Sequence, residues 1–117
     1  MTHFRVDIQL PLCFNKEDGG GKIPEEFFLD THVELLKMIG GIHTSKEPVI
    51  GSWLNPEENN KRYDDKCVVY TTLVESQDKM TITNVPKIKE LIEYKETLKS
   101  RFKQHRIFMV ATRCVWL

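Results

Sequence analysis

Residues 4–14 read FRVDIQLPLCF, and apolar and polar side chains alternate along this stretch. A period of two is typical of a β-strand that has one buried face and one exposed face. The predicted buried row contains Phe4, Val6, Ile8, Leu10, Leu12 and Phe14. Residues 107–117 read IFMVATRCVWL. This second stretch is apolar on both of its faces and is predicted to be the last strand of the chain.

Two helices are predicted between these strands. The first opens at Pro24-Glu25-Glu26, because proline suits a first helical turn and acidic side chains favour the positive end of the helix dipole. Its apolar stripe stops at Gly40-Gly41. The stripe contains Phe28, Leu29, His32, Val33, Leu35, Leu36 and Ile39. The second helix is predicted from about Pro86 to Gln104, where an apolar stripe recurs at helical spacing; it contains Ile88, Leu91, Ile92, Leu98 and Phe102.

The middle of the chain is less regular. Residues 42–54 contain Pro48 and Gly51, which predict an edge strand or a bulge. Residues 55–65 are rich in asparagine and acidic side chains and are predicted to be a polar hairpin connection. Residues 67–74 are β-branched and aromatic, which predicts a strand. The polar segment 15–22 contains three consecutive glycines and is predicted to be a flexible loop with positive φ.

The predicted order is therefore strand, helix, strand, strand, helix, strand. This order indicates an α+β fold of the ferredoxin-like βαββαβ type, with a four-stranded antiparallel sheet and two helices on one of its faces. A chain of 117 residues is of the size of one domain, so residues 1–117 are predicted to form a single domain.

Composition excludes some classes of partner. Seventeen basic and seventeen acidic residues cancel, so no global field attracts polyanions. No signal-peptide pattern and no long apolar run is present, so we expect a cytoplasmic protein with no membrane association. The chain has three cysteines, Cys13, Cys67 and Cys114, an odd number without the spacing of a disulfide framework. They are predicted to be small buried thiols in a reducing compartment.

The last predicted strand has a second apolar face that no predicted helix covers. If Ile107, Met109, Ala111 and Val115 face the helices, the uncovered sheet face carries Phe108, Val110, Cys114 and Trp116. Soluble monomers rarely expose so much contiguous apolar surface, so we expect a homodimer that associates through this sheet face. The interface would also include either Val68 and Tyr70 or Cys67 and Val69, depending on the register of the neighbouring strand. The alternative is that a loop packs over the strand.

Residues with catalytic or binding chemistry are scattered along the sequence. The four histidines lack the ligand spacing of a metal site, so neither a metal nor a cofactor is expected. The triple glycine before Lys22 lacks the spacing of a phosphate-binding P-loop. Cations late in the second helix are explained by the helix dipole. The remaining candidates are His32, His43 and Tyr70 for catalysis, and Trp53, Lys99 and Arg101 for ligand binding.

Several short motifs run through most of the chain. They are Leu10-Pro11-Leu12-Cys13-Phe14-Asn15, Ile23-Pro24-Glu25-Glu26-Phe27, Gly40-Gly41 followed by Thr44, Gly51-Ser52-Trp53, and Leu98-Lys99-Ser100-Arg101-Phe102-Lys103-Gln104. In these motifs the chain resembles small uncharacterised prokaryotic proteins of the ferredoxin-like type. The resemblance implies the ferredoxin-like fold. That group has no assigned activity, so the resemblance implies no catalytic residues.

Three functions are compatible with these observations. The first is a non-enzymatic, cytoplasmic, homodimeric protein that binds a small ligand or a protein partner. The second is a cofactor-independent oxygenase or isomerase, in which a histidine and an aromatic or tyrosine side chain line a cavity between sheet and helices. The third is nucleic-acid or nucleotide binding through the basic end of the second helix and the loop at Gly19–Lys22. Nucleic acid is disfavoured, because no aromatic residue is interleaved with these cations for base stacking.

Overall fold

The computed structural model describes residues 1–45 and 47–117 of the chain. Its strands and helices follow in the order β1 (Thr2–Pro11), α1 (Glu25–Ile39), β2 (His43–Thr44), β3 (Val49–Asn55), β4 (Lys61–Ser76), α2 (Pro86–Phe102) and β5 (Phe108–Cys114). Short 3₁₀ turns occur at Lys16–Asp18 (η1), Pro56–Glu58 (η2) and Ile82–Asn84 (η3). The fold class is α+β, as predicted. In the described part of the chain, neither helix is long and apolar enough to cross a membrane.

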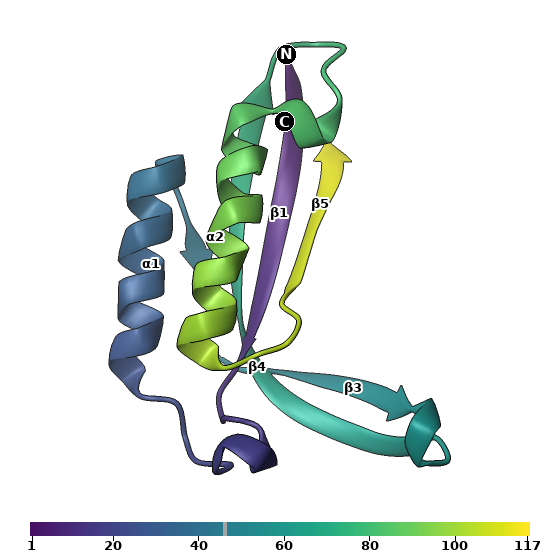
Figure 1. Cartoon of the computed structure of the whole chain (residues 1–117). Coiled ribbons are helices and arrows are strands. Elements are labelled where there is room, and N and C mark those ends of the chain that lie inside the picture. The colour runs from purple at the N-terminus through teal and green to yellow at the C-terminus, as the bar shows by residue number, and fades with distance from the viewer. Residues whose placement is uncertain (46) are drawn as a thin grey trace.

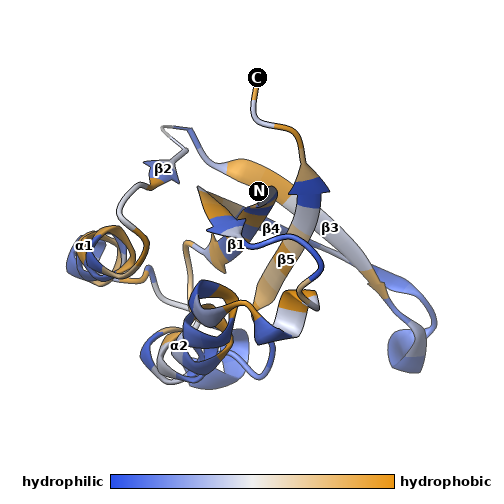
Figure 2. Cartoon of the chain, turned by 90° about the horizontal axis from the view of Figure 1, so that it is seen from above, coloured by the Kyte–Doolittle hydropathy of each residue, from blue (hydrophilic) through white to orange (hydrophobic). Residues whose placement is uncertain are grey.

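The five strands form one antiparallel sheet, and both helices lie on one side of it (Figures 1 and 2). The strand order is β2-β4-β1-β5, and β3 also pairs with β4. The sheet therefore has five strands where four were predicted, and neither the four-stranded sheet nor the ferredoxin-like topology is confirmed. The segment 42–54 was expected to form at most one edge strand, but it contains both β2 and β3, with Pro48 immediately before β3. Residue 46, within this segment, lies outside the described residues.

The alternating pattern of β1 is confirmed and builds the centre of the core. Phe4, Val6, Ile8 and Leu10 point toward the helices and are at most 2% exposed. β1 pairs with β4 along one edge and with β5 along the other. A strand between two neighbours has all of its backbone hydrogen bonds inside the sheet, which suits its place beneath the helices.

The stripe predicted for α2 is confirmed at Ile88, Leu91, Leu98 and Phe102, but Ile92, which was also predicted to belong to it, is 41% exposed. The buried residues of this helix are Ile88, Leu91, Tyr94, Leu98 and Phe102. The Phe102 ring meets the edges of Phe27 and Phe28 from α1, with ring centroids 6.2 and 5.2 Å apart. Edge-to-face aromatic contacts of this kind add to the free energy of area burial. They connect the C-terminal end of α2 to the first turn of α1.

Helix α1 faces the core differently from the prediction. Leu29, Val33 and Leu36 are 64%, 46% and 43% exposed, whereas Leu35 and Thr31 are fully buried. The predicted stripe is wider than the surface that α1 presents to its neighbours, because a helix packed against one layer buries only about a third of its circumference. The residues at positions 29, 33 and 36 follow i, i+4, i+7 spacing and form a separate outer row.

The predicted polar loop at 55–65 is mostly strand. β3 continues to Asn55 and β4 starts at Lys61, with a turn between them in which Asn59 and Asn60 have φ near 60°. Asparagine tolerates this left-handed conformation better than most residues. The composition of the segment therefore reflects its turn and its exposure to water rather than a long loop.

The hairpin formed by residues 49–66, which we call the arm, projects from the body of the molecule (Figure 1). β1 pairs with β4 only from Cys67 onward, whereas β3 pairs with β4 from Lys61 to Cys67. β4 is 16 residues long and bends where it leaves β1 (Figure 1). No core residue comes from the arm.

The three cysteines are free, but they are not equally buried. Cys67 and Cys114 are half-buried, and Cys13 is exposed. The prediction that Cys13 is buried is wrong. Cys13 shares the odd-numbered face of the first segment with Gln9 and Pro11, which point away from the helices, and an isolated bridge connects it to Lys22.

Candidate functional site

The four residues proposed for an interface gather on the sheet face opposite the helices. The register of β5 against β1 pairs Phe108 with Gln9, Val110 with Asp7 and Cys114 with His3. Paired residues of an antiparallel sheet point to the same face, and this is the polar face of β1. Beyond β5, the Trp116 ring lies 6.1 Å from the His3 ring. The chain leaves the sheet on the side away from the helices (Figure 2). We call these four residues the β5 strip.

The β5 strip is not continuous with the apolar residues of β4. The register places Cys67, Val69 and Leu73 on the open face and buries Tyr70 beneath the helices. Between β4 and β5 runs the polar row of β1. In this row Arg5 pairs with Asp7 at 3.2 Å, and Asp7 accepts a 2.7 Å hydrogen bond from Thr71. Charged side chains therefore separate the two apolar regions.

A groove of about 220 Å³ lies on the other side of β5, between this strand and α2. Its apolar lining includes Ile82, Ile88, Ile92, Met109 and Ala111, together with Val110 at the edge. The polar side chains at this groove are Thr83 and Lys95. β5 is consequently flanked by exposed apolar surface on both of its faces.

The residues proposed for catalysis make no hydrogen bond to one another in the described part of the chain. His32 on α1 shares a 2.7 Å hydrogen bond with the Thr44 hydroxyl, and His43 is exposed on β2. Tyr70 is fully buried and donates a hydrogen bond to the carbonyl of Phe28 at 3.1 Å. Burial raises the pKa of the Tyr70 hydroxyl well above its ordinary value. None of these residues lines the groove beside β5, and none lines the second groove of the molecule, which lies between η1 and the end of α2.

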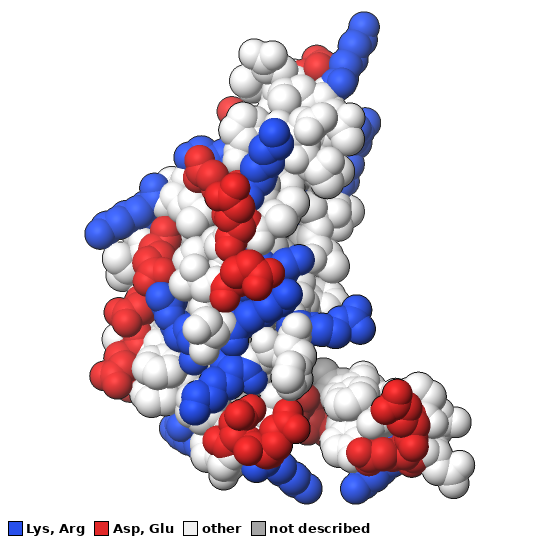
Figure 3. Space-filling view, viewed as in Figure 1, with Lys and Arg blue, Asp and Glu red and all other residues white. Residues whose placement is uncertain are grey.

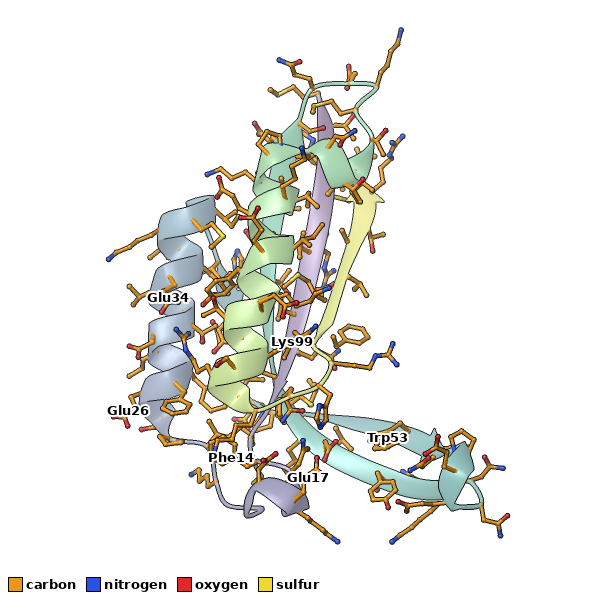
Figure 4. All side chains as sticks on the ribbon, viewed as in Figure 1. Phe14, Glu17, Glu26, Glu34, Trp53 and Lys99 are labelled. Atoms are coloured by element: carbon orange, nitrogen blue, oxygen red, sulfur yellow. The ribbon has the colours of Figure 1, made fainter. Side chains whose placement is uncertain are left out.

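Trp53 lies in the arm, which projects from the body of the molecule (Figure 4). It stacks on Tyr63 of β4, with ring centroids 4.9 Å apart, and half of its surface is exposed. The Tyr63 hydroxyl donates a hydrogen bond to Glu58, which raises the pKa of Tyr63. On the other face of the arm, Ser52 and Arg62 donate hydrogen bonds to Asp64 and lower the pKa of its carboxyl. The arm is thus held together by its own cross-strand pairs.

Lys99 and Arg101 lie on different sides of α2. Lys99 lines a polar groove of about 480 Å³ between η1 and the end of this helix. The groove brings Glu17 and Asp18 close to Lys103 and His105, so its walls carry both signs of charge. Figure 4 labels Glu17 and Lys99 at this end of the molecule. The basic end of α2 and the glycine-loop segment are therefore neighbours, but carboxylates accompany the cations.

Arg101 belongs instead to a cluster that joins the two helices. Its Nη2 donates to both carboxylate oxygens of Glu34 at 2.9 and 2.7 Å, and its Nη1 donates to Thr31 and Tyr94 at 2.9 and 3.3 Å. Tyr94 also donates to Glu34 at 3.0 Å. We call Thr31, Glu34, Tyr94 and Arg101 the inter-helix cluster. The two terminal nitrogens of Arg101 thus reach partners on both helices, so Arg101 is engaged in holding α1 against α2.

This cluster was not predicted from the sequence. Thr31 and Glu34 stand one turn apart on α1, and Tyr94 and Arg101 stand two turns apart on α2. A usable signal was the presence of polar atoms within or beside each apolar stripe, because buried polar groups need partners. In the described part of the chain, every buried side-chain nitrogen and oxygen has a hydrogen-bond partner.

Burial and electrostatics set the protonation of the cluster. Burial, together with the hydrogen bond to Glu34 and its negative charge, raises the pKa of Tyr94 to about 12, and Arg101 offsets part of this. Burial by itself would lower the pKa of Arg101, but the hydrogen bonds to Glu34 and Tyr94 outweigh it, so the pKa is raised. Arg101 therefore stays charged and Tyr94 stays neutral over the ordinary pH range.

Alkaline pH is expected to destabilise the protein through Tyr94. Its pKa is raised from about 10 in the unfolded chain to about 12 in the folded chain. Between these values the unfolded state has lost the proton that the folded state retains, so stability falls as pH rises through this interval. Urea unfolding at several pH values should give this slope, and a Tyr94→Phe variant should give a shallower one. Equal slopes for the two proteins would contradict the assignment.

Charge is mixed over the surface seen from the helix side. Figure 3 shows Lys and Arg interleaved with Asp and Glu over both helices. This matches the balance of seventeen basic and seventeen acidic residues. Among the described residues, no group of three or more His, Cys, Asp or Glu side chains is placed to hold a metal ion.

Comparison of the chain with protein-family models, with curated proteins and with solved structures finds no match. The resemblance to small ferredoxin-like proteins therefore stays a prediction that rests on the short motifs.

Proposed function

We propose that the chain is a non-enzymatic binding protein that acts as a homodimer, joined through the open sheet face at β5. The observation that carries this proposal is the β5 strip. Phe108, Val110 and Trp116 are 51%, 41% and 66% exposed in the isolated chain. Clustered apolar side chains on a sheet edge mark association surfaces more often than they mark a water-facing surface. The dimer then presents its remaining surface to a small ligand or a protein partner.

A binding role agrees with the surroundings of the catalytic candidates. His32 Nδ1 and the Tyr70 hydroxyl make internal hydrogen bonds, which connect α1 to β2 and β4. General acid or base chemistry requires a polar group aimed at a substrate position, with a partner that orients it. These residues are better explained as contacts that fix the position of α1.

We further infer that β2 and β3 are two segments of one interrupted edge strand. β2 pairs with Thr71 and Tyr70, and β3 begins opposite Cys67, so both segments follow the same edge of β4 in succession. Counted together, they make the sheet order equal to that of a ferredoxin-like βαββαβ fold. A single domain and a cytoplasmic location, with three free cysteines, complete the proposal.

The mass in solution tests the proposal. Light scattering at micromolar concentration is expected to give a species of twice the 13.7 kDa mass of the chain. The expectation follows from the apolar area of the β5 strip, since burying each 100 Å² contributes about 2.5 kcal/mol before the costs of association. A Trp116→Ala variant should weaken the dimer, and Trp53→Ala in the arm serves as its control. A wild-type species of 13.7 kDa would rule out the dimer.

A further inference from the structure

We propose that the free edge of β5 pairs antiparallel with β5 of a second copy, so that two sheets join into one continuous sheet. This inference rests on the proposed homodimer and keeps β5 as the region of contact, but it changes how the two copies meet. It replaces packing of one sheet face on another by hydrogen bonding between two strand edges.

The first observation is that β5 has an open edge whose central part lacks the usual protection. β5 is the last strand of the sheet order and pairs with β1 on one side (Figure 1). In the described residues, no backbone hydrogen bond of a turn, loop or cap involves residues 107–117. Natural edge strands are blunted by proline, by bulges or by charged side chains. Residues 107–112 contain no proline, glycine or charged residue.

The second observation is that β5 is apolar on both faces. Phe108 and Val110 are exposed on the open face, while Met109 and Ala111 border the groove beneath α2. A strand added at the edge covers both surfaces at once, because its side chains alternate between the two faces. Face-to-face packing would cover one of them and would place the charges of the β1 polar row in the interface. Burying such charges carries a desolvation penalty.

The third observation is that the strand is self-complementary. An antiparallel pair of identical strands has a two-fold axis, and side chains that face each other must point to the same side of the sheet. With Val110 on the axis, Phe108 lies opposite Thr112. Met109 lies opposite Ala111. Every pair in this central part consists of uncharged side chains.

The charges at the ends of β5 select the antiparallel direction. In the register centred on Val110, Arg113 lies opposite Ile107 and Arg106 lies opposite Cys114 of the second copy, and the two arginines point to opposite faces. A parallel pair in register would place Arg113 beside Arg113, which is destabilising. Charge placement thus favours a second copy in the antiparallel orientation.

Charge substitutions at the axis test this geometry. Val110→Lys places two lysines opposite each other, and Val110→Glu places two glutamates there. Each variant alone is expected to raise the dimer dissociation constant by at least about tenfold, because like charges face each other. An equimolar mixture of the two variants should recover the dimer as a mixed species in sedimentation or light scattering. Circular dichroism establishes that each variant is folded, which we expect because Val110 is 41% exposed.

Leu73→Lys is the matched control. Leu73 lies on the same open face, is 39% exposed and belongs to β4, on the far side of β1. Edge pairing leaves it outside the interface, so the control should dimerise like the wild type. If Leu73→Lys is monomeric, or if Val110→Lys dimerises like the wild type, the edge inference is wrong while the homodimer stands. If the wild-type chain is monomeric, both proposals fail.

Hydrogen exchange on the wild-type chain gives a second measurement that needs no variant. Amides of β5 are expected to become more protected as the protein concentration rises through the dissociation constant, whereas amides of β3 on the opposite edge should not change. Protection of β5 that does not depend on concentration in a dimeric protein would overturn the edge pairing.

Discussion

Leu35→Ala is expected to lower the free energy of unfolding by about 3 kcal/mol. Leu35 is fully buried in α1 and belongs to the core cluster. Its removal loses the transfer free energy of the side chain and leaves a cavity between the helix and the sheet. Urea unfolding followed by circular dichroism measures the effect.

The adjacent leucine provides the control for this prediction. Leu36 is 43% exposed and lies in the outer row of α1, so Leu36→Ala should cost less than about 1 kcal/mol. The two residues are leucines at adjacent positions of the same helix, so the substitutions differ only in the burial of the side chain that is removed. Equal losses from the two substitutions would mean that α1 is rotated relative to the orientation described here.

Arg101→Ala is expected to destabilise the protein by about 2 kcal/mol, because it leaves the Glu34 carboxylate without its principal partner. The Arg101 and Glu34 side chains are 19% and 39% exposed, which places the pair between a surface ion pair and a buried one. Arg101→Lys keeps the charge but lacks the second nitrogen that reaches Thr31 and Tyr94, so an intermediate loss is expected. Urea unfolding again provides the measurement.

Lys99→Ala is the control for Arg101. Lys99 lies on the same helix and pairs at 3.2 Å with Glu96, whose side chain is 71% exposed. Exposed pairs of this kind contribute little, so the loss should be below about 0.5 kcal/mol. A similar loss for Lys99→Ala and Arg101→Ala would show that the inter-helix cluster has no special role.

The sequence predicted β1 and α2 well because each of them has one face that is buried in the core. β1 alternates strictly because one of its faces is under the helices, and the buried positions of α2 recur at regular helical spacing. In these segments the local pattern and the tertiary environment agree, so the periodicity is sufficient to predict the burial.

The elements that sequence predicted poorly depend on what lies beside them. The row of Leu29, Val33 and Leu36 is as apolar as a core row, and only packing decides that it faces water. The division of residues 42–54 into β2 and β3, and the extension of β4 through the predicted loop, depend on hydrogen-bond partners distant in sequence. Strand preference is strongly context-dependent for this reason.

The candidate site was predicted in part. The register confirms that Phe108, Val110 and Cys114 share one face, which follows from their alternate spacing. The separation of this strip from β4 by Arg5 and Asp7 could not be predicted without knowing that β1 lies between the two strands. The inter-helix cluster likewise depends on the side-by-side placement of α1 and α2.

The tip of the arm is a suitable position for a label in the association experiments. This tip, at Asn59 and Asn60, lies at the end of the projecting hairpin, and none of the residues of the arm enters the core. Exposed turns of this kind tolerate insertions with little loss of folding free energy. A fluorophore or a short peptide label placed there would report on association while leaving both sheet edges of the body and the β5 strip unobstructed.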